Sequence, residues 1–181
     1  MDILEFRDTA EWEAWLDTHH ADRAEAWLRI AKRHSGLPLI RIADALDGAL
    51  SFGWIDGQRR AYDDDSFLQR YSRRRKTSSW SKVNVEKVAA LSAAGRMRPA
   101  GVAEVAAAKA DGRWDSAYES QRTAQVPADL AEALSENPTA HAVFDRLGRS
   151  ERYAVILPLL KARTPESRAK ILAREVARLT A

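Results

Sequence analysis

Glycine and proline stand at the ends of most segments with helical apolar spacing, and their placement most constrains how the chain can fold. Gly53, Gly95 and Gly112 each follow such a segment. Glycine is favoured just after a helix because it adopts a left-handed backbone without a steric penalty. Pro99 and Pro165 suit the first turn of a helix, where the missing N–H of proline costs nothing. The chain is therefore predicted to consist mostly of short helices.

Helix starts can be placed from capping patterns. Asp8 and Glu11 have the spacing of a capping box, which predicts that the first helix begins after Asp8. Thr164 has the character of an N-cap in front of Pro165. Pro158 predicts a kink or an early end in the helix that contains it. Apolar periodicity predicts the other helices near residues 42–52, 81–95, 99–112, 130–134, 137–148 and 151–161.

Strand patterns are confined to the first half of the chain. Residues 26–32 have the alternating apolar pattern of a strand. Residues 59–62 and 67–71 flank three consecutive aspartates, which predicts a β-hairpin with an acidic turn. Residues 54–57 are expected to turn the chain between the preceding helix and this hairpin.

Together these elements predict an α+β fold that is mostly helical. A small N-terminal β-hairpin or sheet with helices would be followed by an all-helical C-terminal part. Residues 124–127 have the composition of a linker between an α+β region at 1–123 and a helical region at 128–181. A chain of 181 residues is short enough for the two regions to pack as one compact domain.

The sequence offers little of the chemistry that catalytic and metal sites need. Cysteine is absent, which excludes disulfides, thiolate nucleophiles and zinc–cysteine sites. The adjacent His19 and His20 would diverge by about 100° on a helix and so form no metal-binding face. No zinc-protease, P-loop or serine-hydrolase motif occurs. No metal or cofactor is predicted, and Asp63, Asp64 and Asp65 are interpreted as a solvated turn rather than a cation site.

The N-terminal residues do not resemble a secretory signal, because they lack a basic stretch followed by an apolar run. The longest apolar runs, such as residues 154–160, are far too short to span a bilayer. The lack of cysteine also fits a reducing compartment. We therefore expect a cytoplasmic protein without a membrane span.

Positive charge is concentrated in one part of the chain, although the formal net charge is only +3. Residues 66–85 contain six bases and no acid. Such a local excess favours an anionic partner, which could be a small molecule, a protein or nucleic acid. The alternative is a solvated loop without a partner. The six bases are Arg70, Arg73, Arg74, Arg75, Lys76 and Lys82.

Two glycines bracket Trp54 and Asp56 at the exit of a predicted helix. A tight turn at this point would expose a rigid aromatic ring beside a carboxylate, which suits ligand binding. The alternative is that the glycines supply backbone freedom and Trp54 packs in the core, as large aromatic side chains mostly do.

Residues 73–84 combine guanidinium groups, hydroxyls, a tryptophan and the expected start of a helix. Arginine binds phosphate and carboxylate oxygens bidentately, and free N–H groups at a helix start add partial positive charge. An aromatic ring among bases also suits stacking on a nucleobase. The specificity of the pattern is low, since any basic loop before a helix would share it. The residues predicted to bind here are Arg73, Arg74, Arg75, Lys76, Ser79, Trp80 and Asn84.

Several stretches together resemble a known family, the bacteriocin-protection family, also described as YdeI or OmpD-associated. The most specific motifs are GWIDG at 53–57 and SxWSxxN at 78–84. The resemblance implies tolerance of antimicrobial peptides and association with an outer-membrane porin, and it implies no reaction. The other matching stretches are 49–52, 95–101, 108–114, 137–144 and 161–171, so the resemblance covers nearly the whole chain.

Three hypotheses stay open from the sequence. The first, implied by the resemblance, is a non-enzymatic stress or bacteriocin-resistance protein that binds an anionic ligand or partner. Trp54 and Trp80 would frame its site, the bases would hold the anion, and Asp56 would orient a base or accept a ligand donor. The second is a nucleic-acid-binding protein that uses the basic loop at 70–82. The third is a small-molecule enzyme with Asp56 as general acid or base, which requires Asp56 to lie in a concave pocket.

Overall fold

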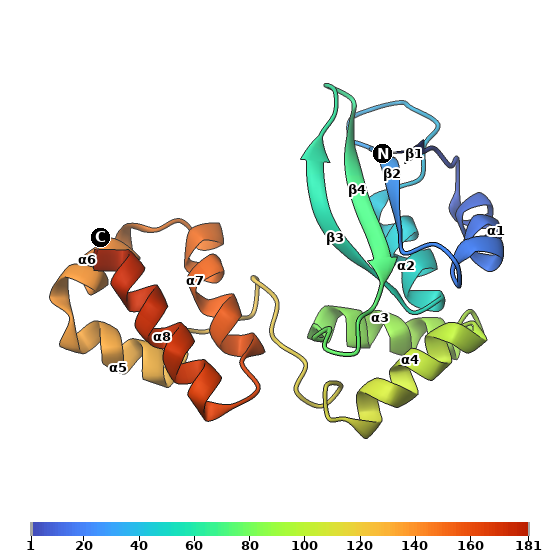
Figure 1. Cartoon of the computed structure of the whole chain (residues 1–181). Coiled ribbons are helices and arrows are strands. Elements are labelled where there is room, and N and C mark those ends of the chain that lie inside the picture. The colour runs from blue at the N-terminus through green and yellow to red at the C-terminus, as the bar shows by residue number, and fades with distance from the viewer. Residues whose placement is uncertain (1, 181) are drawn as a thin grey trace. The chain divides into compact units, whose positions relative to one another are not determined.

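The computed structural model describes residues 2–180 and divides them into two compact units (Figure 1). The first unit comprises residues 2–80 and 84–116, and the second comprises residues 81–83 and 117–180. Helices hold 51% of the residues and strands 15%, with a four-stranded sheet near the N-terminus, which confirms the predicted mostly helical α+β fold. No helix within residues 2–180 is both long enough and apolar enough to cross a membrane.

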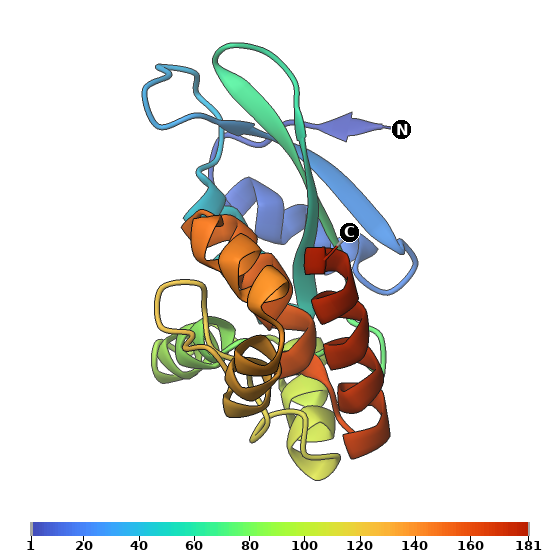
Figure 2. The same cartoon turned by 90° about the vertical axis from the view of Figure 1, so that its left-hand side faces the viewer.

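The first unit is built on a sheet with the strand order β1-β2-β4-β3, in which β1 is parallel to β2 and the other neighbours are antiparallel. Figures 1 and 2 show the tip of the β3–β4 hairpin at the end of the unit away from α3 and α4. The strands are β1 (Ile3–Leu4), β2 (Glu25–Ala31), β3 (Trp54–Ala61) and β4 (Ser66–Arg73). The helices are α1 (Thr9–His19), α2 (Ile42–Ser51), α3 (Lys82–Ala93) and α4 (Pro99–Ala110).

The β3–β4 hairpin is longer than the sequence pattern predicts. Residues 54–57 form the start of β3, where Trp54 lies opposite Arg73, so the prediction of a turn there is wrong. The chain already turns at Gly53, whose φ of +75° lies in the left-handed region that favours glycine. Phe52 and Gly53 therefore suffice to connect α2 to β3, and the residues after Gly53 are free to pair with β4.

The helix starts predicted from capping patterns are confirmed. At α1 the Asp8 carboxylate accepts the N–H of Glu11 at 3.0 Å. The Glu11 carboxylate accepts the backbone N–H of Arg7 rather than that of Asp8. Before the last helix, the Thr164 hydroxyl accepts the N–H of Ser167 at 3.1 Å. Each side chain satisfies a backbone donor that has no partner within its helix.

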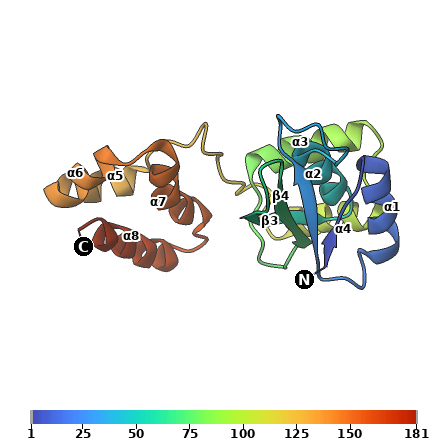
Figure 3. The same cartoon turned by 90° about the horizontal axis from the view of Figure 1, so that it is seen from above.

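Aromatic rings fill the core of the first unit, where α1 and α2 pack against the same face of the sheet (Figure 3). The ring of Trp12 lies 6.3 Å from that of Trp54 and 5.9 Å from that of Tyr71, and all three side chains are buried. The Trp12 indole N–H donates to the Ala45 carbonyl at 3.0 Å. Gly48 makes room for this ring, because a Cβ there would lie only 2.6 Å from it. Burial of each large apolar side chain stabilises the unit by about 2 kcal/mol.

The second unit is all helical beyond the predicted linker, and its boundary with the first unit falls at residues 116–117. Leu130, Phe144 and Leu159 are among the residues that form its apolar core. The Asp129 carboxylate accepts two hydrogen bonds from the Arg168 guanidinium, at 2.6 and 2.8 Å, and these lower the pKa of Asp129. The helices are α5 (Ala128–Glu136), α6 (Pro138–Arg146), α7 (Arg149–Lys161) and α8 (Pro165–Thr180).

Of the two outcomes predicted at Pro158, a kink or an early helix end, the early end is wrong, because α7 continues past the proline to Lys161. Val155, Ile156 and Leu159 surround the proline in sequence and are all buried in the core. Their burial offsets the backbone hydrogen bond that a helix loses at proline.

The two helices α2 and α4 approach closely at Gly101. A Cβ at Gly101 would lie 2.2 Å from the carbonyl oxygen of Ser51, at the end of α2. The same carbonyl accepts the N–H of Arg98 at 3.0 Å, which fixes its position. The backbone contact therefore excludes any side chain at Gly101.

The substitution Gly101→Ala is expected to lower the free energy of unfolding by about 1–3 kcal/mol, because a hydrogen-bonded backbone carbonyl must move. Gly36→Ala is the matched control, since a Cβ there would meet nothing within 4 Å. Urea denaturation of the wild type and both variants measures the difference. Equal stability of Gly101→Ala and Gly36→Ala would contradict the close approach of the two helices.

Candidate functional site

Trp54 belongs to the core rather than to a surface. Its side chain is 1% exposed, its indole N–H donates to the His20 carbonyl at 3.3 Å, and its ring meets those of Trp12 and Trp15 edge-on. Asp56 is exposed further along β3. The ring of Trp54 has no free face for a ligand, because the core packs around it. This corrects the hypothesis that Trp54 presents its ring beside Asp56.

Trp80 is also 1% exposed, but in a different group of side chains. Its ring lies 4.9 Å from that of Trp114, and the Arg74 guanidinium lies 3.5 Å from its ring centre. Arg74 is itself 8% exposed and donates to the Ser79 carbonyl at 3.2 Å. No ring contact joins Trp54 to Trp80 within the described residues. The two tryptophans therefore do not frame a common ligand site.

Most bases of the loop at 70–82 already interact within the protein. Two form ion pairs with carboxylates, one donates to a backbone carbonyl, and one stacks on Trp80. Arg75 and Lys76 are exposed, and neither forms an ion pair with any residue in 2–180. Ser79 is half-buried and Asn84 is 7% exposed. The bases that already interact are Arg70, Arg73, Arg74 and Lys82.

A cleft of about 1110 Å³ lies between the segment that links β2 to α2 and the hairpin strands. Small-molecule sites typically enclose roughly 300–1,000 Å³, so the cleft is large enough for an organic ligand. Its lining contains five bases and no acid. The lining residues are 31–33, 35–37, 39, 41–43, 59–61 and 67. We call it the basic cleft. The five bases are Lys32, Arg33, Arg41, Arg59 and Arg60.

The basic cleft also has an apolar part. Leu37, Leu39, Ile42 and Phe67 line it, and each of these side chains is half-buried. Apolar side chains gain when a ligand removes their exposed area from water, and the cations gain when it brings an anionic group. The lining therefore suits an organic anion that has an apolar body.

A bulge in β3 determines where the hairpin arginines point. The pairing register shifts between Asp56 and Arg59, so two residues of β3 lie opposite Arg70 of β4. The buried side chain of Gln69 stabilises this bulge by donating to the Gly57 carbonyl at 3.0 Å. Successive side chains of a strand point to opposite faces, and the extra residue changes which residues of β3 face which side.

After the bulge, the two arginines of β3 lie on opposite faces of the sheet. Arg59 donates from Nε to the Gln69 amide oxygen at 3.3 Å, and its guanidinium lies 4.3 Å from the centre of the Phe67 ring. The guanidinium of Arg60 lies 4.6 Å from the centre of the Trp27 ring. Both cations are held by neutral groups. Only Arg59 lies over a ring that lines the basic cleft, because Trp27 beneath Arg60 belongs to the other face of the sheet.

The remaining arginines of the basic cleft come from the other wall. Arg33 follows β2 and Arg41 is the N-cap of α2, and both are exposed. Neither forms an ion pair with another described residue. No N-cap side chain accepts a hydrogen bond from the first N–H groups of α2, so the positive end of the helix adds to the potential of the cleft. Asp44 lies in the same first turn but does not line the cleft.

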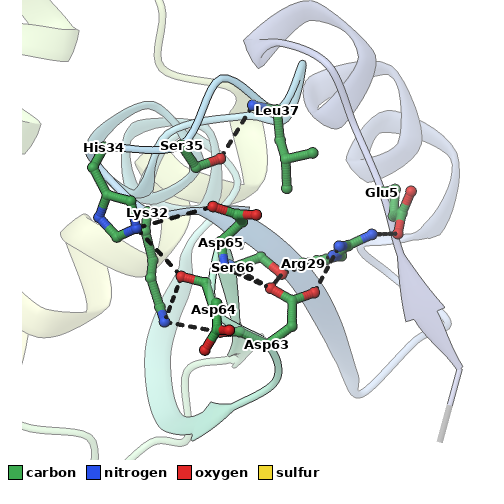
Figure 4. A network of polar contacts seen from close by, with 10 residues as sticks. All are labelled: Glu5, Arg29, Lys32, His34, Ser35, Leu37, Asp63, Asp64, Asp65 and Ser66. Atoms are coloured by element: carbon green, nitrogen blue, oxygen red, sulfur yellow. Dashed lines mark hydrogen bonds and ion pairs between the residues drawn. The ribbon is translucent and has the colours of Figure 1, made fainter.

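A polar network holds the wall that carries Lys32 (Figure 4). The Lys32 ammonium donates to the backbone carbonyls of Asp63 and Asp64 at 2.8 and 3.0 Å. The Asp63 carboxylate accepts hydrogen bonds from the Ser66 hydroxyl at 2.7 Å and from Arg29 at 2.8 Å, and the bond from Ser66 is the main cause of its lowered pKa. Arg29 therefore neutralises the Asp63 carboxylate, and the hydrogen bonds from Lys32 join the hairpin tip to the segment after β2.

The basic cleft offers cations rather than acid–base or metal-binding groups. No acid lines it, and the exposed Asp56 is not part of it. Across residues 2–180, no three acids or histidines are grouped so that they could hold a metal ion. What the geometry can do chemically is to bind oxyanions with guanidinium groups beside an apolar surface.

Comparison with family models assigns the two parts of the chain differently. A model described as a domain of unknown function (DUF8412) matches residues 4–104, more than half of the chain. The chain belongs to the DUF8412 family. A second model, described as bacteriocin-protection, YdeI or OmpD-associated, matches residues 123–181 and supports the resemblance found in the sequence. No curated protein and no solved structure matches the chain.

The basic cleft lies entirely within the DUF8412 part, since its lining runs from residue 31 to residue 67. The GWIDG motif at 53–57 and the SxWSxxN motif at 78–84 also lie within the DUF8412 part. The bacteriocin-protection match instead covers the helices α5 to α8. The two motifs that most specifically resemble the bacteriocin-protection family therefore lie, in this chain, in the DUF8412 part.

Sequence reasoning missed the basic cleft because its bases come from two separate segments of the DUF8412 part. Residues 32–41 supply three bases and Arg59 and Arg60 supply the others, and only the pairing of strands brings the segments together. A usable signal was present, since residues 32–43 contain three bases and no acid. That segment follows a predicted strand, and Arg59 and Arg60 begin the predicted hairpin.

The substitution Arg74→Gln is expected to lower the free energy of unfolding by about 1–2 kcal/mol, because it removes the cation from the buried ring of Trp80. Arg75→Gln removes the same charge from an exposed position and should change stability by less than about 0.5 kcal/mol. Urea denaturation at matched ionic strength measures both values. Equal losses in the two variants would mean that net charge matters here and the stacking does not.

Proposed function

We propose that the DUF8412 part of this chain binds a small organic anion in the basic cleft, and that the chain acts as a binding protein rather than as a catalyst. One observation carries the proposal: five bases and no acid line a single cleft of about 1110 Å³. Most buried or half-buried arginines of the first unit meet carboxylates, as Arg29 and Arg113 do, whereas the four arginines of the basic cleft are exposed and form no ion pair with a described residue. The concentration of arginines without carboxylate partners in one hollow is what an anion site requires.

The proposed ligand has an anionic group and an apolar body. The guanidinium of Arg59 is already oriented by Gln69 and Phe67, so less conformational freedom is lost when it binds. Phosphate, sulfonate and carboxylate groups all fit the donor fork of arginine. The apolar wall formed by Leu37, Leu39 and Ile42 favours a ligand with a hydrocarbon or aromatic part over a bare inorganic anion.

The two alternatives from the sequence have less geometric support. Nucleic-acid binding through the loop at 70–82 rests on Arg75 and Lys76, since the other bases of the loop interact within the protein. Catalysis by Asp56 would require a concave pocket around that carboxylate, and Asp56 is exposed outside the basic cleft.

The basic cleft is expected to bind anilinonaphthalene sulfonate, a fluorescent aromatic anion whose emission rises in an apolar site. The double variant Arg33→Gln/Arg59→Gln should bind it at least about tenfold more weakly, because each charge-assisted contact stabilises by roughly 1.5–3 kcal/mol. Fluorescence titration of the folded protein measures the affinity. Inorganic phosphate, added as a competitor, should reduce the signal only at much higher concentration.

The matched control is Arg75→Gln/Lys76→Gln, which removes the same net charge from the exposed loop. This control should keep the wild-type affinity. If it loses affinity while Arg33→Gln/Arg59→Gln does not, the site is the loop and the proposal fails. Equal losses in both variants would reduce the effect to net charge. A steep loss of affinity for an oligonucleotide with added salt, together with no effect of Arg33→Gln/Arg59→Gln, would favour the nucleic-acid alternative.

We further propose that this binding serves bacteriocin protection in the cytoplasm, a role suggested by the description of the model that matches residues 123–181. Expression of the wild type should raise the survival of a bacteriocin-sensitive bacterium, and expression of Arg33→Gln/Arg59→Gln at the same level should not. Equal survival with both proteins would show that protection does not depend on the basic cleft. Cell fractionation would test the location.

A further inference from the structure

The second unit contains its own cleft, of about 630 Å³, beside the start of α7. One wall is the segment 121–126 that precedes α5, and the other is formed by Leu147 and the first turns of α7. Every lining residue belongs to the second unit, so the cleft exists regardless of how the two units are placed. We call it the helical cleft.

Three arginines and no acid line the helical cleft. Arg122 and Arg149 are exposed, and neither forms an ion pair with another residue in the described range 2–180. Arg152 is the third arginine of the same lining. Like charges gathered in one hollow repel one another, and an anion would relieve that repulsion.

Arg152 is held in place by backbone groups. Its Nε donates to the Leu147 carbonyl at 3.1 Å, and its Nη2 donates to the Asp145 carbonyl. The Asp145 carboxylate lies 3.9 Å away but is itself exposed, so this ion pair neutralises little of the charge. The guanidinium also lies 5.4 Å from the centre of the Phe144 ring. The cation is thus oriented before any ligand arrives, which lowers the entropic cost of binding.

Hydrogen bonds join the two walls of the helical cleft. The Gln121 amide donates to the Ser150 hydroxyl at 2.9 Å. The Tyr153 hydroxyl donates to the Glu119 carbonyl at 2.8 Å. These hydrogen bonds connect the segment before α5 to the first turns of α7, so both walls of the helical cleft are fixed by the fold.

The start of α7 borders the helical cleft at Arg149. The Glu151 carboxylate accepts the N–H of Gly148 at 2.8 Å and offsets the positive end of the helix, but Glu151 does not line the cleft. The remaining N–H groups of the first turn have no acceptor within the helix. Leu147 and Ile156 supply an apolar floor.

We infer that the helical cleft binds a small polyanion, whose oxygen atoms contact Arg122, Arg149 and Arg152. The volume lies within the range of small-molecule sites, which favours a compact molecule over a protein segment. The fork of arginine accepts phosphate and carboxylate oxygens alike, so the shared chemistry is two or more oxyanions on one small molecule. This site is independent of the proposed function, because none of its residues belongs to the basic cleft.

The test is isothermal titration of the full chain with pyrophosphate and, separately, with citrate. The double variant Arg122→Gln/Arg149→Gln should bind the preferred probe at least about tenfold more weakly than the wild type. Tighter binding of pyrophosphate would identify a phosphate-bearing ligand, and tighter binding of citrate a polycarboxylate. The same comparison in an Arg33→Gln/Arg59→Gln background removes any contribution from the basic cleft and should give the same ratio.

The matched control is Arg146→Gln/Lys170→Gln, which removes the same charge from exposed positions of the second unit that do not line the cleft. It should keep the wild-type affinity. Equal weakening in this control, or no heat from either probe at millimolar concentration, would overturn the inference. Circular dichroism checks that the helices persist. Arg149→Lys, which keeps the charge but loses the fork, should give an intermediate loss, whereas unchanged affinity in both arginine variants would also overturn it.

Discussion

The side-chain amide of Gln69 holds the arrangement on which the basic cleft depends. It is 2% exposed, and it donates to the Gly57 carbonyl in the bulge while accepting a hydrogen bond from Arg59. A buried amide without partners costs about 1–3 kcal/mol, so the bulge and the amide stabilise each other. Gly57 suits this point because a Cβ there would lie 3.1 Å from Nε of Arg70. One irregularity in a strand thereby turns a hairpin edge into the wall of a charged cleft.

Much of the fold follows from local signals. Helix ends depend on capping residues, glycine and proline within a few positions of each other, and Asp8, Gly95 and Thr164 act as their residue types predict. Strand bounds depend on a partner elsewhere in the chain, which is why residues 54–57 were expected to turn but pair with β4. Pro158 departs from its residue type because the buried core around it outweighs a local cost.

The candidate site followed from the sequence much less. Tryptophan and arginine serve equally in a binding surface and in a buried stack, and single-sequence patterns do not distinguish the two uses. Trp80 and Arg74 turn out to stack on each other in the interior. The bases of the basic cleft are separated along the chain and meet only through the register of β2, β4 and β3. Net charge in a window of sequence therefore pointed to a loop whose bases mostly interact within the protein, because charge density in space depends on the topology of the sheet.

The bulge in β3 has a consequence beyond ligand binding. β3 is the last strand in the order of the sheet, so its outer edge presents backbone groups that a strand from another molecule could pair with. The bulge breaks the regular spacing of those groups at Gly57, and the cations of Arg59 and Arg60 repel a second copy of the same edge. The irregular strand therefore also guards the protein against edge-to-edge aggregation, and straightening it would create a surface on which sheets of different molecules could join.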